Sequence, residues 1–334
     1  MDAIPVEAAR ERAKQTLARV HLGADPHAER TEANARRVVT LEKVAARYLE
    51  NAHGRLKRRS YEEVSRHLTK HWAPLSDLPI HKIDRALVAA RLDDIAEGSG
   101  PIAANRARSS LSALYSYALG MGLADFNPVA GTLKLGQEVK RDHVVADNEL
   151  RAIWRACGPN DHGRIVRLLL LTAQRRDEVG SMQWAEIDLN SGTWVIPAAR
   201  SKNRRPHEVP LAPEAVSILR EVPRVLGRDY VFGTGRGGFS GWSKAKRELD
   251  LKANALLPTL IPWRIHDLRR TAATGMANLG VAPHIIEAAL NHISGSRAGV
   301  AGIYNRATYR DEKRSALSIW AAQVRSNNLA DIKR

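Results

Sequence analysis

The apolar residues between positions 40 and 121 recur every three or four residues, which is the spacing of one face of an α-helix. The first run starts after Thr40, a residue type that caps helix N-termini well, and continues with Leu41, Val44 and Leu49. Runs of the same period cover residues 60–71, 84–96 and 101–121. The pattern predicts four helices that form a small bundle.

The pattern changes beyond residue 132. Residues 134–142 are polar and follow the helix-breaking sequence Asn-Pro-Val-Ala-Gly, so we expect a linker there. After it, helical spacing covers residues 147–156 and 162–172 and resumes at Pro213. Two short apolar strands, 194–197 and 207–211, flank a basic turn at 200–205 and predict a hairpin. The chain is therefore predicted to be mainly α with a small β-sheet, an α+β fold.

The first residues form a separate segment. Residues 5–37 are rich in Ala, Arg and Glu at helical spacing, and a turn signal, Gly-Ala-Asp-Pro, stands at 23–26. The segment is too short to bury a core of its own, whereas a hydrophobic fraction of 44% over 334 residues is enough for two or three domains with cores.

The charge of the chain indicates the kind of partner. Lys and Arg number 52 against 36 Asp and Glu, a net charge of +16, which favours a polyanion and above all nucleic acid. A basic protein with an unrelated role is the alternative. Basic residues of the predicted bundle could follow a phosphate backbone or form a solvated helix face: Arg55, Lys57, Arg58, Arg59, Arg66, Lys70, Arg106 and Arg108.

Other compositional features narrow the class of protein. Cys157 is the only cysteine, which excludes an internal disulfide and a cysteine-rich zinc module. The longest dense apolar block, residues 165–173, is too short for a membrane span and contains Arg167, and no secretory signal opens the chain. We therefore expect a cytoplasmic protein. The Gly-rich segment 233–241 lacks the nucleotide-binding pattern G-x-x-x-x-G-K-[ST].

The pair His266 and Arg269 is a candidate phosphate grip. Residues three apart share a helix face, so the guanidinium fork can hold two phosphate oxygens while the imidazole reaches a third group. The same spacing occurs at His27 and Arg30, in a segment that we interpret as non-catalytic. The pair alone is therefore weak evidence, and its weight depends on the rest of the chain.

Five elements stand in a fixed order along the chain, and together they are specific. They are residues 172–178 (Thr-Ala-Gln-Arg-Arg-Asp-Glu), Lys202 in the hairpin, His266-x-x-Arg269, Leu290-Asn291-His292, and Tyr304 near the C-terminus. In this order the chain resembles the tyrosine recombinase (phage integrase) family over essentially its whole length. It is most similar to integrases of prophages and genomic islands, in which Tyr-x-Arg, here Tyr304-Asn305-Arg306, precedes a charged helix.

The resemblance implies a domain organisation. Residues 38–132 would be a helical core-DNA-binding domain and residues 143–334 a mixed α/β catalytic domain with the nucleophile and an interaction helix near its C-terminus. Residues 133–142 would link the two. Residues 1–37 resemble the closing part of an arm-binding-type domain and its linker.

The resemblance also implies that Tyr304 is the nucleophile. A phenol can conserve the energy of a broken phosphodiester in a covalent 3′-phosphotyrosine, but its pKa of about 10 requires a group that takes its proton. Tyr309 is the alternative nucleophile. We prefer Tyr304 because it stands two residues before Arg306, as in the family, whereas Tyr309 introduces the polar start of the next helix.

The resemblance also implies roles for the other site residues, each of which would stabilise charge on the phosphate or transfer a proton during cleavage. Arg175 and Arg269 would clamp the non-bridging phosphate oxygens, and losing one such donor costs roughly 2.7 to 4 kcal/mol of transition-state stabilisation. His266 would accept a proton or donate to the phosphate, and His292 would donate a hydrogen bond to it. Lys202 would protonate the leaving 5′ oxygen; an exposed turn lysine is the alternative.

Two further implications concern Glu178 and the tail. Glu178 would orient Arg175, although an ordinary surface ion pair is equally consistent with the spacing. An apolar stripe of Leu317, Trp320 and Val324 would pack either on its own domain or on a neighbouring protomer. The sequence leaves both of these alternatives open.

The chain departs from the family pattern at two positions. Glycine is usual where this sequence has Ala173 and Asn291. Asn tolerates a left-handed backbone, whereas at Ala173 a positive φ would cost about 1 kcal/mol. Neither departure removes a reactive group.

The function implied is a site-specific DNA recombinase that needs no metal and no cofactor. Its partners would be double-stranded DNA attachment sites, a homotetramer on DNA, and accessory DNA-bending or directionality proteins, in a bacterial cytoplasm and at the nucleoid. A type IB topoisomerase-like nicking and closing enzyme would share the same residues but act as a monomer. A non-catalytic DNA-binding regulator is the third possibility, disfavoured because all six reactive residues are present.

Overall fold

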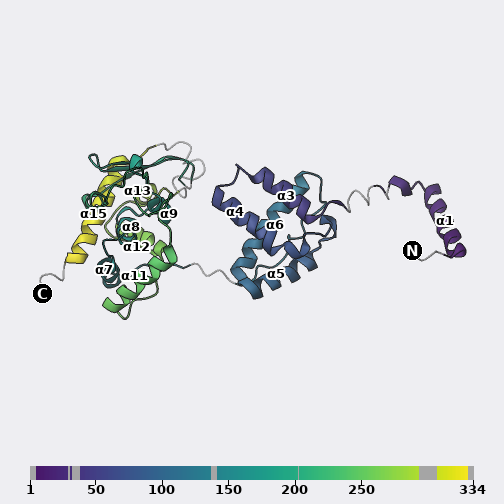
Figure 1. Ribbon diagram of the computed structural model, residues 1–334, viewed down its shortest axis with the longest axis horizontal. Helices are drawn as coiled ribbons and strands as arrows, with labels where there is room; N and C mark the ends of the chain where they lie inside the picture. The colour runs from purple at the N-terminus through teal and green to yellow at the C-terminus, as the bar shows by residue number, and fades with distance from the viewer. Residues whose placement is uncertain are drawn as a thin grey trace. The chain divides into compact units, whose positions relative to one another are not determined.

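The computed structural model describes residues 5–28, 31, 38–136, 141–201, 203–292 and 307–329. The chain divides into two compact units, Met1–Lys140 and Arg141–Arg334, and each is described by itself (Figure 1). Within the described ranges, no helix is both long and apolar enough to cross a membrane.

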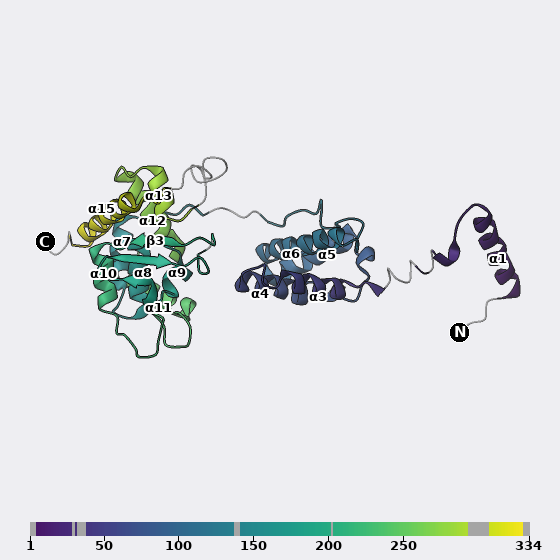
Figure 2. The same ribbon diagram turned by 90° about the horizontal axis from the view of Figure 1, so that it is seen from above.

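The first unit contains a helical bundle. Figures 1 and 2 show its four long helices packed together. Their bounds, with three short turns of other helix types, are α3 (Leu41–Ala52), α4 (Arg58–Arg66), η1 (His67–His71), η2 (Ala73–Leu75), η3 (Ile80–Lys82), α5 (Arg85–Ser99) and α6 (Pro101–Gly120). Trp72, Leu111 and Leu114 are fully buried in its core. The four predicted helices are confirmed, although the third turn of the second one is a π-helix, η1.

Local sequence explains where these helices begin. The Thr40 hydroxyl accepts the N–H of Lys43 at 3.4 Å, and the Asp84 carboxylate accepts that of Leu87 at 2.9 Å, so both act as N-caps. Gly100, with φ of +88°, turns the chain between α5 and α6, and Pro101 then occupies the first position of α6, where its missing N–H costs nothing.

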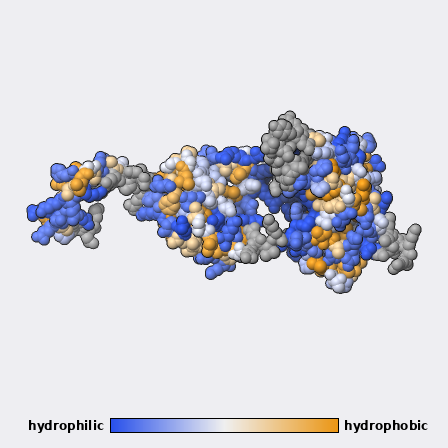
Figure 3. Space-filling view, turned by 180° about the vertical axis from the view of Figure 1, so that it is seen from behind, coloured by the Kyte–Doolittle hydropathy of each residue, from blue (hydrophilic) through white to orange (hydrophobic). Residues whose placement is uncertain are grey.

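Helix α1 (Val6–His21) precedes the bundle. None of its residues is buried, in agreement with a segment too short to form a core. Val6 and Leu17 are 67% and 60% exposed, and hydrophobic and hydrophilic residues both lie on the surface of this helix (Figure 3).

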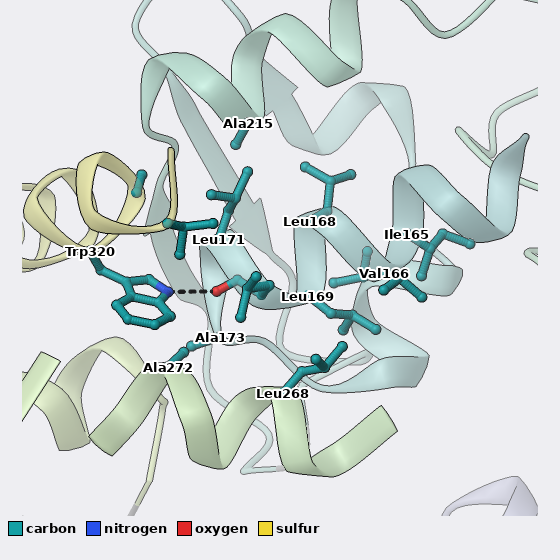
Figure 4. Packing of buried hydrophobic residues seen from close by; sticks show 14 of the residues in the cluster. Ile165, Val166, Leu168, Leu169, Leu171, Ala173, Ala215, Leu268, Ala272 and Trp320 are labelled. Atoms are coloured by element: carbon teal, nitrogen blue, oxygen red, sulfur yellow. Dashed lines mark hydrogen bonds between the residues drawn. The ribbon is translucent and has the colours of Figure 1, made fainter. Parts of the chain in front are cut away.

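The second unit is built around helix α8. Its helices are α7 (Asp147–Ala156), α8 (Asp161–Thr172), α9 (Arg176–Gly180), η4 (Trp184–Glu186), α10 (Pro213–Arg220), α11 (Trp242–Leu256), α12 (Ile265–Asn278), α13 (Pro283–Ala289) and α15 (Arg310–Leu329). Figure 4 shows buried side chains of α8 packed close to α12 and to Trp320 of α15. A helix that is apolar almost all round is a core helix.

Helix α15 closes this core. Leu317, Trp320 and Val324 are 1%, 4% and 0% exposed, so the apolar stripe packs on its own unit. The indole Nε1–H of Trp320 donates to the carbonyl oxygen of Leu170 at 2.8 Å (Figure 4). This bond satisfies the polar end of a buried aromatic side chain.

A three-stranded antiparallel sheet lies beside the helices, in the order β1 (Ile187–Asp188), β2 (Thr193–Ile196) and β3 (His207–Pro210). The pairing Ile196 with His207 fixes the register of the predicted hairpin, whose turn carries the basic residues. The sequence did not predict β1, which has only two residues. The fold class is confirmed: the protein is mainly helical with one small sheet.

Candidate active site

Helix α8 ends in a left-handed turn just before Arg175. Ala173 has φ of +54°, and its N–H donates to the carbonyl oxygen of Leu169 at 3.0 Å, which is the αL form of helix ending. A positive φ is therefore present where the family pattern has glycine, at a cost of about 1 kcal/mol. The turn redirects the chain so that Arg175 becomes the N-cap residue of α9.

Glu178 holds Arg175 by both its main chain and its side chain. Oε2 of Glu178 accepts the N–H of Arg175 at 3.0 Å, and Oε1 accepts Nη1 at 3.1 Å. The side chain of Glu178 is only 5% exposed, so this is not an ordinary surface ion pair. A buried two-point contact of this kind fixes the orientation of the guanidinium group.

Arg269 lies on α12 and is buried. Its Nη1 donates to the carbonyl oxygen of Ala173 at 2.5 Å, and its Nη2 donates to that of Leu290. Burial, followed by the positive charge of Arg175, lowers the pKa of Arg269 to about 10, while Glu178 opposes the shift. Arg269 therefore stays cationic at neutral pH.

Asp267 secures the start of the same helix. Its buried carboxylate accepts the N–H of Arg264 at 2.8 Å and pairs with Arg141 at 3.1 Å and Arg270 at 2.8 Å. A carboxylate at a helix N-terminus satisfies free N–H groups and complements the helix dipole. The first turn of α12, which carries His266, is thus held in place.

His266 is exposed in that first turn. Its pKa is lowered, chiefly by partial loss of hydration and then by the positive charges of Arg269 and Arg270, with Asp267 acting in the opposite direction. The neutral imidazole is favoured, and this is the form that can accept a proton.

The end of α13 is where these side chains converge. Three successive main-chain carbonyl oxygens accept hydrogen bonds from side chains there. The oxygen of Ala289 accepts from Gln174 at 2.9 Å and from His207 at 3.1 Å, and that of Leu290 accepts from Arg269. The oxygen of Asn291 accepts from Arg175 at 3.3 Å and from Asn203 at 2.8 Å. The last carbonyls of a helix carry partial negative charge, which favours guanidinium groups there. We call residues 289–291 the α13 hub.

The backbone of the α13 hub also positions His292. Asn291 has φ of +48°, its N–H donates to Ala288 at 3.2 Å, and the N–H of His292 donates to Glu287 at 2.9 Å. These two bonds form a Schellman motif, the commonest way to end a helix with a left-handed residue. His292 itself is exposed.

The β2–β3 turn is tied to the α13 hub and to α9. The amide of Asn291 donates to the hydroxyl of buried Ser201 at 3.0 Å, and the amide of Asn203 donates to the Asn291 carbonyl. Arg200 donates to the carbonyl oxygens of Glu178, at 3.0 Å, and Ser181, and forms a buried ion pair with Glu186 at 2.7 Å. Ser201 and Asn203, which flank position 202, are therefore held by the hub. Arg200, at the start of the turn, is held by α9.

His207 and Lys313 line the back of the site. Burial, then the nearby charge of Lys313, lowers the pKa of His207 to about 3, so its ring is neutral and can donate to Ala289 from Nε2. Lys313, on α15, is 4% exposed and donates to the carbonyl oxygen of Glu208 at 2.7 Å. The sheet, α13 and α15 are thus joined behind the hub.

Among the residues predicted from the sequence, Arg175, Glu178 and Arg269 come together at the α13 hub. His266 lies one turn before Arg269 on α12, and His292 directly follows the hub. Five of the seven predicted site residues are therefore described, on three neighbouring elements.

Lys202 and Tyr304 lie outside the described residues. The rival nucleophile, Tyr309, is described and half-buried, with its ring packed edge-to-face on His284 at 5.3 Å between centroids. This packing gives Tyr309 a structural position beside α13.

Sequence reasoning missed several residues that build the site. Gln174, Arg200, Asn203 and His207 were not singled out, and Asn291 was noted only as a departure from glycine. All of them act through contacts between segments far apart in the chain. The departure at position 291 was the one signal that could have drawn attention to the hub.

The arrangement is suited to an anion. Arg175 and Arg269, which are held at the α13 hub, and the exposed His266 and His292 are residue types that can surround a phosphate and neutralise charge that develops on it. In the described part of the chain, no three His, Cys, Asp or Glu side chains cluster as a metal site would require.

The chain is similar to two curated prophage integrases and to one solved integrase structure. Prophage integrase IntA of Escherichia coli K12 is 34% identical over 164 residues, which cover 49% of this chain and 38% of IntA. Prophage integrase IntZ of the same strain is 29% identical over 244 residues, 69% of this chain and 57% of IntZ. The fold is that of a lambda integrase in a structure of its tetramer bound to a Holliday junction, with 21% identity, a TM-score of 0.63, and 88% and 90% of the two chains covered.

The chain covers roughly two fifths to three fifths of the length of these curated relatives. Family models match it directly: the phage integrase central domain matches residues 41–134, and the phage integrase family model matches residues 144–310, which is half of the chain. The chain therefore belongs to the phage integrase family.

Proposed function

We propose that this protein is a site-specific DNA recombinase that cleaves and rejoins DNA through a 3′-phosphotyrosine intermediate. The observation that carries the proposal is the α13 hub, which holds Arg175 and Arg269 by adjacent carbonyl oxygens. Two guanidinium groups held next to each other can donate hydrogen bonds to the non-bridging oxygens of a phosphodiester. They stabilise the negative charge that develops on these oxygens during phosphoryl transfer. Membership of the phage integrase family supports the same reading.

In the proposed reaction the phenol oxygen of Tyr304 attacks phosphorus and the bond from phosphorus to the 5′ oxygen breaks. Neutral His266 takes the phenol proton, and Lys202 gives a proton to the departing 5′ oxygen. Arg175, Arg269 and His292 stabilise the charge that builds on the phosphoryl oxygens. Attack of a 5′ hydroxyl from another strand on the phosphotyrosine reverses these steps and completes strand exchange.

We further propose double-stranded attachment sites as the substrate, with four copies of this chain assembling on two paired sites. A lambda integrase of the same fold has been seen as a tetramer bound to a Holliday junction, and the net charge of +16 suits a large DNA surface. Residues 38–132 would bind the core of the DNA attachment site, and residues 143–334 would catalyse cleavage and rejoining of the strands. Accessory DNA-bending proteins and a bacterial, nucleoid-associated location belong to the same proposal.

The test uses the full chain and a duplex that the chain itself selects from a random-sequence library. A nick placed near the cleavage position lets a short fragment diffuse away, so that the covalent adduct accumulates. The wild-type protein should give a denaturant-resistant adduct with DNA. Tyr304→Phe should bind the duplex with unchanged affinity and give no adduct, because only the phenol oxygen is removed.

Tyr309→Phe is the matched control and should retain the adduct. An adduct that survives in Tyr304→Phe and is lost in Tyr309→Phe would move the nucleophile, and no adduct with wild-type protein would overturn the proposal. Relaxation of supercoiled DNA without any recombinant product from paired sites would assign the chemistry to a topoisomerase-like enzyme instead.

A further inference from the structure

The two described residues on either side of position 202 both contact one residue, Asn291. The Nδ2 of Asn291 donates to Oγ of Ser201 at 3.0 Å. The Nδ2 of Asn203 donates to the carbonyl oxygen of Asn291 at 2.8 Å and to its Oδ1 at 3.3 Å. Ser201 is fully buried and Asn291 is 9% exposed, so the bond between them is shielded from water, whereas the bonds from Asn203 are partly buried.

The conformation of Asn291 explains why this contact is unusual. A φ of +48° is most easily adopted by glycine, and Asn is among the few other residues that tolerate it. Glycine would form the same Schellman turn but has no side chain that reaches Ser201. The asparagine therefore adds a hydrogen bond that the turn itself does not require.

The carbonyl oxygen of Asn291 serves a second element. It accepts Nη2 of Arg175 at 3.3 Å as well as the amide of Asn203. One residue thus joins Arg175, which is proposed to contact the phosphate, to the two described residues on either side of position 202. The main-chain atom makes the contact with Arg175, and the side chain makes the contact with Ser201.

We propose that Asn291 is a positioning residue that holds the β2–β3 turn against the end of α13, so that proton donation by Lys202 to the leaving 5′ oxygen depends on its amide group. The inference rests on the proposed function and adds a residue to it. It predicts a defect that is confined to leaving-group protonation. Phosphate binding by Arg175 persists, because the main-chain carbonyl remains in any variant at position 291.

The variant that tests this is Asn291→Gly. It keeps the left-handed turn and removes only the side chain. On the nicked duplex, adduct formation should slow by at least about 3- to 10-fold, because the variant loses the hydrogen bond to Ser201 at 3.0 Å and the longer one from Asn203 at 3.3 Å. On the same duplex with sulfur in place of the bridging 5′ oxygen, Asn291→Gly should match the wild-type rate within about twofold, because a thiolate, with a reference thiol pKa of about 8.5, departs without a proton.

Two comparisons make the experiment decisive. Ser201→Ala removes the acceptor of the same bond, so the double variant Asn291→Gly with Ser201→Ala should be no slower than the slower single variant. Ala173→Gly changes another left-handed position of the site without removing a hydrogen bond, and its ratio of oxygen to sulfur rates should equal that of the wild type. Lys202→Ala should show the largest rescue by sulfur.

Each other outcome counts against the inference. Equal slowing of Asn291→Gly on both duplexes would place its effect on phosphate binding or on folding, and an unchanged rate would show that the tether is dispensable. If sulfur in the bridging position does not restore the rate of Lys202→Ala, Lys202 is not the proton donor to the leaving 5′ oxygen, and Asn291 has no such donor to position. If wild-type protein forms no adduct with either duplex, the proposed function itself fails, and that result is distinct from a failure of the tether.

Discussion

The guanidinium group of Arg175 meets the carboxylate of Glu178 at 3.1 Å, and the same carboxylate also accepts the main-chain N–H of Arg175. Both ends of one residue are therefore fixed by a second residue three positions away. Because Glu178 is almost fully buried and Arg175 is mostly buried, solvent screens the contact only weakly. In the proposed function, the orientation of Arg175 toward a phosphate depends on this carboxylate.

Glu178→Gln should slow adduct formation by roughly 10- to 100-fold, because hydrogen bonds to charged groups contribute about 1.5–3 kcal/mol each and one of two acceptor oxygens is lost. DNA affinity should change little, since the proposed function has many other basic residues in contact with DNA. The measurement is the single-turnover rate of adduct formation at saturating protein. Asp177→Asn, which alters the exposed neighbouring pair with Arg176, is the control and should leave the rate within twofold.

His207 makes stability depend on pH in a defined direction. Its folded-state pKa is lowered to about 3, whereas an unfolded histidine takes up a proton near pH 6.5. Between these values only the unfolded chain binds the proton, so the free energy of unfolding falls as pH falls, by about 1.4 kcal/mol per pH unit from this one group. Above pH 6.5 the contribution is constant.

His207→Gln should flatten this dependence, because the amide can still donate to Ala289 but does not titrate. Urea unfolding followed by tryptophan fluorescence at pH values between 4.5 and 7 measures the difference, since six of the seven tryptophans, all except Trp72, lie in the second unit. Equal slopes for the variant and the wild type would show that His207 is protonated in the folded state.

Gly275 gives α12 a close approach to α15. A Cβ atom at this position would lie 2.1 Å from Cζ3 of Trp320, an overlap that requires the Trp320 ring or one of the two helices to shift. Gly275→Ala should therefore lower the free energy of unfolding by about 1–3 kcal/mol, the cost of overpacking a core.

Gly98→Ala provides the comparison for Gly275→Ala, because Gly98 also lies in a helix but has open space around an added Cβ. That variant should keep or raise stability, by up to about 1 kcal/mol. The midpoint of thermal unfolding, followed by circular dichroism, measures the stability of both variants. An unchanged midpoint for Gly275→Ala would show that Trp320 can repack.

The helices could be predicted from the sequence because their signals are local. Apolar spacing, and at Thr40 a capping residue, placed most long helices within a few residues, and the mainly helical fold class with one small sheet is confirmed. Short elements escaped because two strand residues in β1 or five helical residues in α9 carry too little periodicity. A hairpin could be recognised since both of its strands flank one turn.

The site was predictable only as a set of residue types. The order of motifs singled out Arg175, Glu178 and Arg269, and the structure brings these three together. Their supports were not predictable, because Asn291 and Ser201 are 90 positions apart and nothing local marks the bond between them. The assignments of Lys202 and Tyr304 stay predictions.

The α13 hub is made of main-chain oxygens, and this has a consequence for how the protein can evolve. A carbonyl is present whichever side chain a codon specifies, so mutational drift at Ala289 or Leu290 alters packing but leaves each anchor for Gln174, His207 and Arg269 in place. Related sequences can therefore differ at positions 289 and 290 while the side chains that bind these carbonyl oxygens keep their arrangement.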